Sequence, residues 1–188
     1  MSIALIGGPT GVGKTSIVEA LLKLDSKFVR PAAYTTRPAR PEDNEYQFTH
    51  VTNVEMEQLS LAGKLLSLDE VHGHLYALSK DSIEHLASQN KVVIKEFFLR
   101  DHHSVRDFYP DTLSVVIMPL SAETLTAHIR ANSMVKTRAQ TRGDTEFSEH
   151  AQLLESHPAD IIIYNNFVAS IDELAKKLGQ EITTLLST

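Results

Sequence analysis

The chain has 188 residues, a formal charge of −6 at pH 7, and 42% hydrophobic against 22% charged side chains. This length suits one domain with a single buried core, and the composition is that of a globular protein, not a disordered one. No apolar run reaches the ~18 residues that a membrane span needs, and an acidic chain has no general attraction for nucleic acid. The lack of cysteine excludes disulfides and thiolate metal sites, which suits a reducing cytoplasm.

Apolar runs rich in β-branched residues alternate with segments of helical periodicity. The runs are 3–7 (IALIG), 92–98 (VVIKEFF), 113–119 (LSVVIMP) and 160–165 (DIIIYN). The first run has no basic segment before it and reaches glycine quickly, so it reads as a buried strand and not as a secretion signal. Residues 15–24 and 170–186 place apolar side chains at helical spacing. The alternation predicts a three-layer α/β/α fold with a parallel sheet covered by helices.

Two segments interrupt this pattern. Residues 35–79 contain polar loops, one predicted helix at 54–63 and a β-like stretch at 65–78, and we expect them to form an inserted lobe on the substrate side. Residues 131–147 are polar, carry several basic side chains and have little to bury, which predicts a lid, either frayed or helical. The single domain, 1–188, would then have its core in 1–34, 80–130 and 148–188.

The strongest chemical signal follows the first predicted strand. Gly8, Gly13, Lys14 and Thr15 fit the Walker A, or P-loop, pattern G-x-x-x-x-G-K-[ST], with a strand before it and a helix after it. Backbone N–H groups of such a loop surround phosphate oxygens, the Lys reaches the outer phosphates, and the Thr hydroxyl suits Mg²⁺. An ordinary glycine turn would not need the Lys-Thr pair. We therefore predict an ATP site formed by Gly8, Gly11, Gly13, Lys14, Thr15 and Ser16.

A second anion site is predicted from the segment TTRPARP, where Arg37 and Arg40 are each followed by a proline. Guanidinium groups are planar and permanently charged, and each can make two parallel hydrogen bonds to one phosphate. Pro38 and Pro41 restrict the backbone, so the loop is expected to be stiff. Beside a P-loop, the two arginines are suited to hold the phosphate of an acceptor. The alternative is a solvated loop with two unrelated arginines.

The chain resembles the guanylate kinase family through GPTGVGKTS, YTTRPARP, EYQF, LAGKLLSLDEVHGHLYALSK and ADIIIYNN, which occur in order along nearly its whole length. The resemblance implies a P-loop NTPase core with an acceptor-binding lobe and a lid. It also implies that Arg37 and Arg40 bind the acceptor phosphate together with the hydroxyl groups of Tyr46 and Tyr76. For Tyr46, the alternative is that its ring fills the core of the lobe.

Several positions depart from the family pattern. The family reads the guanine edge with Ser, Glu, Ser or Thr, and Asp, where this chain has Ala33, Ser67, Leu78 and Phe98. A site that pairs with a base edge rejects analogues because unmet polar groups are costly, so these losses are expected to weaken discrimination. GMP remains the default acceptor by resemblance. Another nucleotide or a phosphorylated sugar such as ribose bisphosphate is the alternative.

Three further polar positions take roles from the resemblance. Glu96 stands where the family has the first of two acids, and it is predicted to lie beside the acceptor and to order Mg²⁺, partly through water; pairing with Lys95 or a lid arginine is the alternative. Glu70 is a candidate contact in the acceptor pocket or a salt-bridge partner of a clamp arginine. Asn165, with Asn166, falls near the adenine-side turn of the family, or alternatively caps the final helix.

The predicted lid supplies positive charge for phosphoryl transfer. Arg138 and Arg142 are four residues apart, which places them on one face of a helix, and an arginine beside the transferring group can contribute ~10³–10⁵ in rate. Arg130 and Lys136 are possible substitutes. A solvated basic helix is the alternative interpretation.

Together these features predict a magnesium-dependent phosphotransferase that moves the γ-phosphoryl group of ATP to the phosphate of a small acceptor. The predicted catalytic residues are Lys14, Arg37, Arg138 and Arg142. The expected partners are ATP and the acceptor, without nucleic acid or membrane, in a cytoplasmic monomer or homodimer. A noncatalytic phosphopeptide-binding module of the same fold is the alternative of another class, and the intact Lys14 and Thr15 argue against it.

Overall fold

The structure is a computed structural model that describes residues 1–40, 48–71, 73–131 and 143–187. The chain forms two compact units. The smaller comprises Met1–Ser2 and Lys27–Val93, and the larger comprises Ile3–Ser26 and Ile94–Thr188. The lobe predicted at 35–79 falls inside the smaller unit, which begins earlier and ends later in the chain.

Parallel strands form the centre of the larger unit. Strands β1 (Ile3–Gly7), β8 (Leu113–Pro119) and β9 (Ile161–Asn165) follow one another, and the end of β7 (Val92–Glu96) lies on the other side of β1. All five residues of β1 are buried, because helices cover both faces of the sheet. The apolar runs in the sequence therefore mark these strands correctly, although β7 ends at Glu96 and the two phenylalanines that follow it lead into a 3₁₀ turn, η1 (Leu99–Asp101).

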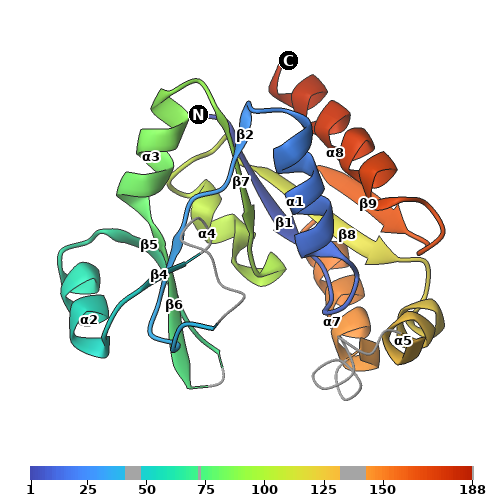
Figure 1. Cartoon of the computed structure of the whole chain (residues 1–188), viewed down its shortest axis with the longest axis horizontal. Coiled ribbons are helices and arrows are strands. Elements are labelled where there is room, and N and C mark those ends of the chain that lie inside the picture. Colours follow the sequence, from blue (N-terminus) through green and yellow to red (C-terminus); the bar gives the residue numbers. More distant parts are fainter. Residues whose placement is uncertain (41–47, 72, 132–142, 188) are drawn as a thin grey trace. The chain divides into compact units, whose positions relative to one another are not determined.

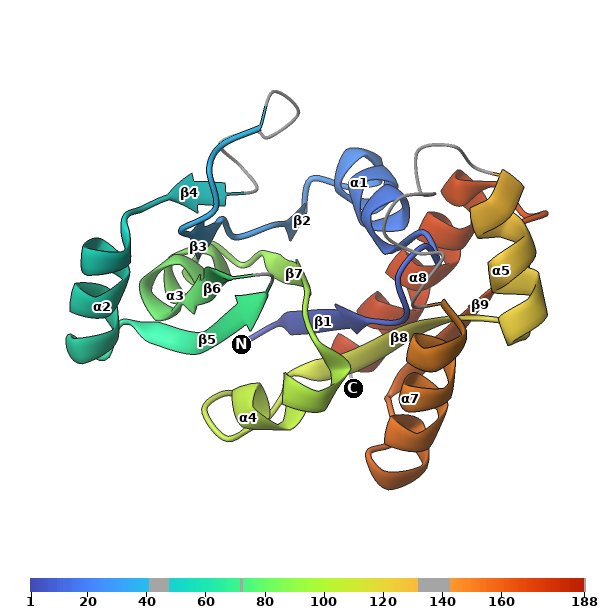
Figure 2. The ribbon, with the colours of Figure 1, turned by 90° about the horizontal axis from the view of Figure 1, so that it is seen from below.

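Helices cover the sheet of the larger unit in two layers. Helices α1 (Lys14–Leu24) and α8 (Ile171–Leu186) pack against each other on one face, and α4 (His102–Arg106) and α7 (Gly143–Ser156) lie on the other (Figures 1 and 2). Helix α5 (Ala122–Ala131) packs against α7. This arrangement confirms the predicted α/β/α layering of a P-loop NTPase.

The apolar spacing of α8 explains its place on the sheet. Leu174, Leu178 and Ile182 recur every four residues and are all buried. Ser170 caps the start of the helix by accepting a hydrogen bond from the backbone N–H of Glu173, whose side chain accepts one from the backbone N–H of Ser170. The alternative that Asn165 or Asn166 caps this helix is therefore wrong.

The smaller unit contains a four-stranded sheet in the order β4-β3-β6-β5. Its strands are β3 (Ala33–Thr35), β4 (Phe48–His50), β5 (Leu65–Val71) and β6 (His74–Ser79), and the last two form a hairpin from the β-like stretch at 65–78. Helix α2 (Asn53–Leu61) coincides with most of the helix predicted at 54–63, and α3 (Lys80–Ser88) follows β6. A short strand, β2 (Phe28–Val29), pairs with the first residues of β7.

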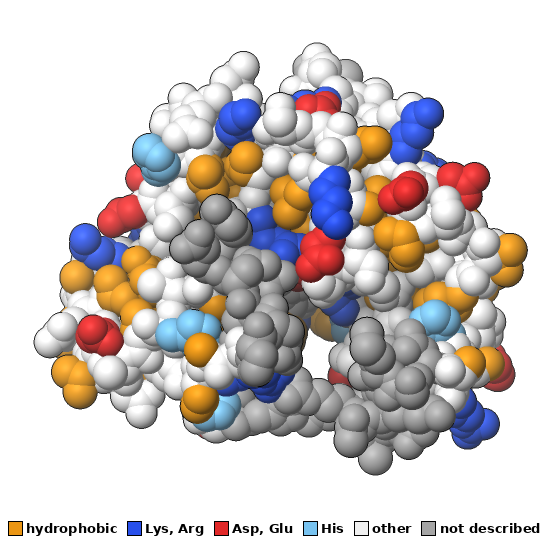
Figure 3. Space-filling model, in the orientation of Figure 1, with side chains coloured by type: hydrophobic (Ala, Val, Ile, Leu, Met, Phe, Trp, Pro, Cys, Tyr) orange, Lys and Arg blue, Asp and Glu red, His pale blue; other side chains and the backbone are white. Residues whose placement is uncertain are grey.

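The segment predicted as a lid, 131–147, lies mostly outside the described residues. Its last five residues form the beginning of α7. On the face seen in Figure 3, acidic and basic side chains are interspersed with hydrophobic ones. Within the described ranges, no helix combines the length and the hydropathy that a membrane crossing requires.

Candidate active site

The P-loop connects β1 to α1 at the carboxyl edge of the parallel sheet. Gly8 has a φ of 140°, and a Cβ at this position would overlap the carbonyl oxygen of Ile117 on β8. Only glycine allows the loop to pass so close to the strand. The loop then ends at Gly13, whose φ of 96° precedes the first residue of α1. The first and last glycines of the Walker A pattern, Gly8 and Gly13, are therefore both required by the backbone conformation of the loop.

Asn165 supports this loop from the end of β9. Its side-chain Nδ2 donates to the carbonyl oxygen of Val12 at 2.9 Å, and its Oδ1 accepts from the backbone N–H of Phe167 at 2.8 Å. The side chain is 2% exposed and lies 3.2 Å from where a Cβ on Gly13 would stand. Asn165 therefore joins the donor loop to the turn after β9, a role that its position in the sequence alone does not reveal.

Lys14 is folded back onto the loop. Its Nζ donates to the carbonyl oxygens of Gly8 at 2.6 Å and Pro9 at 2.9 Å. Burial lowers the pKa of Lys14 to about 8, although the carboxylates of Glu146 and Glu96 oppose this shift. Lys14 thus remains mostly protonated near neutral pH, with its ammonium group held where the glycine loop turns.

Both predicted metal-binding residues lie in the larger unit. Thr15 is exposed at the start of α1, and Glu96 is half-buried at the end of β7. The backbone N–H of Phe97 donates to the carbonyl oxygen of Ile6 at 3.1 Å, so Glu96 and the start of the P-loop share one edge of the sheet. Among the residues that the structure describes, no three His, Asp or Glu side chains are placed to hold a metal ion.

Glu146 is a site residue that the sequence reasoning missed. It lies in the first turns of α7, and its Oε2 accepts a hydrogen bond of 2.6 Å from the backbone N–H of Thr10 in the P-loop. The two residues are 136 positions apart in the chain, and no motif links them. The acidic side chain just beyond a basic segment was the only available signal.

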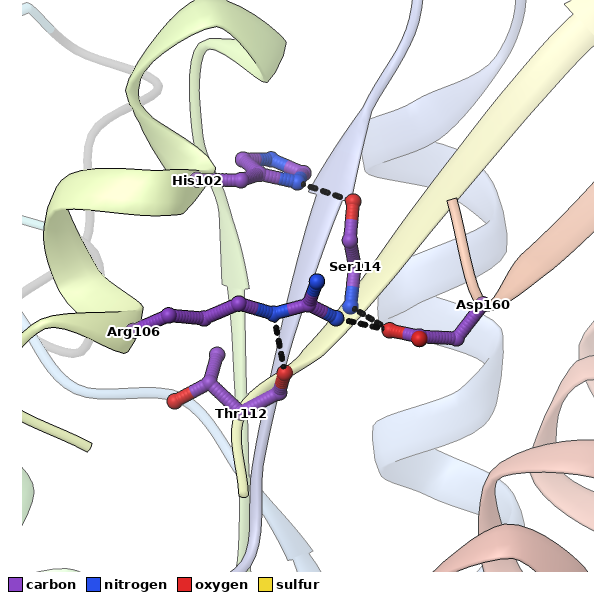
Figure 4. A network of polar contacts seen from close by, with 5 residues as sticks. All are labelled: His102, Arg106, Thr112, Ser114 and Asp160. Atoms are coloured by element: carbon purple, nitrogen blue, oxygen red, sulfur yellow. Dashed lines mark hydrogen bonds and ion pairs between the residues drawn. The ribbon is translucent and has the colours of Figure 1, made fainter. Parts of the chain in front are cut away.

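A polar network, buried at His102 and Ser114 and reaching the surface at Asp160, joins three segments of the larger unit (Figure 4). The Nδ1 of His102 is hydrogen-bonded to the Oγ of Ser114 at 2.7 Å, and the backbone N–H of Ser114 donates to Asp160 at 2.6 Å. Asp160 also forms an ion pair with Arg106, whose Nε donates to the carbonyl oxygen of Thr112 at 2.8 Å. The network connects α4 to the start of β8 and to the residue before β9.

Within this network, His102 is held in its neutral form. The pKa of His102 is lowered to about 4, mainly by burial and to a smaller extent by the charges of Arg106, His150 and His103, while the backbone of Phe97 opposes the shift. The imidazole is 4% exposed, stacks on Phe97 and would lie 3.4 Å from a Cβ on Gly7. Its contacts are those of a packing residue beneath the P-loop.

The smaller unit holds one of the two predicted clamp arginines in a buried setting. Arg37 is 6% exposed, its guanidinium lies 5.2 Å from the centroid of the Phe48 ring, and one of its nitrogens donates to the carbonyl oxygen of Pro38 at 3.0 Å. The Nδ1 of His50 donates to the backbone oxygen of Arg37 at 2.7 Å. Arg40 is half-buried on the same loop. The backbone and the head group of Arg37 are thus both fixed.

Tyr76 lies on the same face of the small sheet as this clamp. It pairs across the ladder with Thr35, and its ring meets that of Phe48 edge-on at 6.2 Å. Glu70 points to the opposite face, because its neighbour Asp69 is the residue that pairs with Tyr76. The structure therefore brings Arg37, Phe48 and Tyr76 together and does not bring Glu70 to them. Tyr46 lies outside the described residues.

Three of the altered base-reading positions form one row across the small sheet. Ala33 on β3 is paired with Leu78 on β6, which is paired with Ser67 on β5. Ala33 and Leu78 are buried, and Ser67 is half-buried. The fourth position, Phe98 in the larger unit, is 42% exposed, and its ring lies 4.9 Å from the Arg100 guanidinium.

The lid arginines Arg138 and Arg142, and the possible substitute Lys136, fall outside the described residues. Arg130 is exposed in the last turn of α5. The roles assigned to these four residues stay predictions.

Comparison with known proteins identifies the family. A family profile described as guanylate kinase matches residues 1–184. The chain belongs to the guanylate kinase family. It is 30% identical over 164 residues to the guanylate kinase of Nitrosomonas europaea, covering 87% of this chain and 77% of the relative. It is also 30% identical over 179 residues to that of Symbiobacterium thermophilum, covering 95% and 81%.

The fold of the guanylate kinase family is also evident from a solved structure. The crystal structure of guanylate kinase from Anaplasma phagocytophilum superposes with a TM-score of 0.72 at 19% sequence identity, over 97% of this chain and 85% of the other. The chain is thus a member of a phosphotransferase family with the family's P-loop fold. The P-loop in the larger unit and Arg37 in the smaller one are the predicted site features that the described residues define most fully.

Proposed function

We propose that the chain catalyses transfer of the γ-phosphoryl group of ATP to the phosphate of GMP, giving ADP and GDP. The observation that carries this proposal is the complete P-loop, with Lys14 bonded across it, in a chain that matches the guanylate kinase profile over residues 1–184. The relatives compared above are named guanylate kinases. The comparisons lend no support to a sugar phosphate acceptor or to a noncatalytic phosphopeptide-binding role.

The donor half of the reaction is carried by the larger unit. In this proposal, backbone N–H groups between Gly8 and Thr15 bind the phosphates, and the start of α1 adds the partial positive charge of its dipole. In this proposal Lys14 exchanges its bonds to the two loop carbonyls for bonds to phosphate oxygens. The hydrogen bond from Asn165 to the carbonyl oxygen of Val12 stabilises the backbone of the loop, so that the loop does not reorganise when the nucleotide binds.

Magnesium fits the residues present. The ion prefers oxygen ligands, retains water and bridges the phosphates of the nucleotide, so it does not need a cage of protein carboxylates. Thr15 would supply a hydroxyl ligand, and Glu96, at the same edge of the sheet, would hold one of the waters. When bound, Mg²⁺ neutralises part of the charge that builds up on the phosphates.

The acceptor half uses the clamp of the smaller unit. Arg37 and Arg40 would bind the GMP phosphate, with the hydroxyls of Tyr76 and Tyr46 beside it. Arg37 is already buried and fixed, so little side-chain entropy is lost when it binds. One oxygen of the GMP phosphate attacks the γ-phosphorus as the bond to the β–γ bridging oxygen breaks, and the electron pair of that bond stays on ADP. Arg138 and Arg142 are proposed to stabilise the transferring group.

This activity requires no macromolecular partner. Substrates of this size are free nucleotides, so we propose that the chain acts in the cytoplasm, as a monomer or homodimer, without binding nucleic acid or a membrane.

The test is a coupled assay of ADP release from ATP with GMP and Mg²⁺. The wild-type chain is expected to turn over, and Lys14→Ala is expected to lose at least ~10² of kcat, because the mutation removes a charge that interacts with the transferring phosphoryl group. Lys23→Ala, an exposed lysine on the same helix, serves as the matched control and should keep its activity. A wild-type chain that binds ATP but never phosphorylates GMP would refute the proposal.

A further inference from the structure

A carboxylate occupies part of the phosphate-binding loop. The Oε2 of Glu146 accepts a short hydrogen bond of 2.6 Å from the Thr10 backbone N–H, and a carboxylate acceptor makes this bond charge-assisted. Thr10 is one of the P-loop residues whose amides would otherwise face a phosphate oxygen. The contact therefore places the negative oxygen of a side chain where the oxygen of a nucleotide phosphate would bind.

The packing of α7 holds Glu146 in this place. The next residue, Phe147, packs with Leu153 and Leu154 against the buried cluster of Leu99, Val116 and Met118. One turn along the helix, the Nδ1 of His150 donates to the backbone oxygen of Glu146 at 2.7 Å. The carboxylate thus extends from an anchored helix and is not the end of an unsupported side chain.

The carboxylate of Glu146 also interacts electrostatically with Lys14 of the P-loop. Its attraction for the ammonium group raises the pKa of Lys14, against the larger effect of burial. A polyphosphate that enters the loop would need both the Thr10 amide and Lys14. The carboxylate of Glu146 is thus favourably placed beside the Thr10 amide and Lys14, and it would repel a polyanion bound to the same groups.

We infer that Glu146 is an internal ligand of the donor site, which competes with the nucleotide phosphates for the P-loop and sets the affinity for ATP. The inference rests on the proposed donor site but not on the identity of the acceptor. In the structure the carboxylate satisfies the Thr10 amide. When ATP binds, the side chain of Glu146 leaves the amide. The apparent affinity for ATP is therefore the intrinsic affinity multiplied by the fraction of molecules in which the carboxylate is already away from the amide.

The competition is tested by titrating ATP into the full chain by isothermal calorimetry, without any acceptor. Glu146→Gln keeps the size of the side chain and removes its charge, and it is expected to bind ATP about three- to thirtyfold more tightly than the wild type. Glu149→Gln removes an equal charge from an exposed position on the same helix and should bind as the wild type does. Glu146→Ala, which removes the acceptor altogether, should bind at least as tightly as Glu146→Gln.

A second readout reports the contact directly. In the nucleotide-free protein, the amide proton resonance of Thr10 is expected to move upfield in Glu146→Gln, because a charge-assisted hydrogen bond becomes a neutral one, and to stay in place in Glu149→Gln. Unchanged or weaker ATP binding in both Glu146 variants would overturn the inference. Because no acceptor is present, this result is independent of whether GMP is phosphorylated, which decides the proposed function.

Discussion

At the scale of single residues, His102 shows how burial fixes the chemical state of a side chain. The imidazole lies between α4 and the strands beneath the P-loop, and its Nδ1 is hydrogen-bonded to Ser114 (Figure 4). Burial lowers the pKa of His102 to about 4, below the usual value of about 6.5 that it regains in the unfolded chain. The unfolded chain therefore binds a proton more readily than the folded protein does.

The stability of the protein should fall as the pH drops from about 6.5 towards 4, because protons stabilise the unfolded state in this window. His102 is expected to contribute about 2 kcal/mol to the loss of unfolding free energy between pH 7 and pH 5. His102→Gln should reduce this pH dependence by that amount, even if it lowers stability at pH 7. Urea denaturation at the two pH values measures both quantities.

The matched control is His85→Gln, which replaces an exposed histidine on α3. Its pH dependence is expected to follow that of the wild type. If His102→Gln lost as much stability between pH 7 and pH 5 as the wild type does, the neutral state assigned to His102 would be wrong.

At the scale of elements, the small sheet arranges the clamp. Strand β4 pairs with β3, which pairs with β6, so side chains of the three strands project from one face. Because Ala33 and Thr35 on the middle strand are small, the ring of Phe48 on β4 reaches Tyr76 on β6. The same ring lies beside the Arg37 guanidinium. One aromatic side chain therefore contacts two groups that are proposed to hold the acceptor phosphate.

Phe48→Leu should disturb the acceptor side of the reaction alone. Loss of the cation–π contact is expected to raise the KM for GMP about three- to tenfold. The KM for ATP should stay within about twofold, because the P-loop is formed by other elements. Phe48→Tyr keeps the ring and should restore the KM for GMP. Steady-state kinetics with each substrate varied in turn make the comparison, and equal increases in both KM values would contradict it.

Several strands of both sheets were predictable from local patterns in the sequence. The runs at 3–7 and 113–119 coincide with β1 and β8, and the stretch 65–78 contains the β5–β6 hairpin. The end of β7 was placed two residues too late, because Phe97 and Phe98 are apolar and resemble a strand in the sequence. In the structure the chain turns at this point into η1, which the apolar pattern does not encode.

At the scale of the whole molecule, the altered base-reading positions are divided between the two units. Ala33, Leu78 and Ser67 form a row in the smaller unit, and Phe98 lies in the larger one. Two of the three positions in the row carry buried apolar side chains, which cannot form hydrogen bonds with a base edge. The proposed site therefore offers fewer polar groups to guanine than the family pattern does.

We expect GMP to be phosphorylated with weak discrimination against other nucleoside monophosphates. A site that relies on shape distinguishes similar ligands by ~10–200-fold, against 10⁴–10⁵ for a site with matched hydrogen bonds. The ratio of kcat/KM for GMP to that for AMP should therefore lie in the lower range. Parallel assays with GMP, IMP and AMP at saturating ATP measure it, and a preference above ~10⁴ would show that other side chains read the base.

The sequence by itself determined the main strands of the core, its first and last helices, the P-loop and the two arginines of the predicted clamp. These features depend on residues close together in the chain: an apolar period, a glycine that permits a positive φ, a lysine placed after it. Only the tertiary structure decided that Glu146 bonds to Thr10, that Asn165 supports the loop, that His102 is neutral and that Glu70 points away from the clamp. Each of these depends on how distant segments pack and register against one another, and such packing leaves no periodic signal in the sequence.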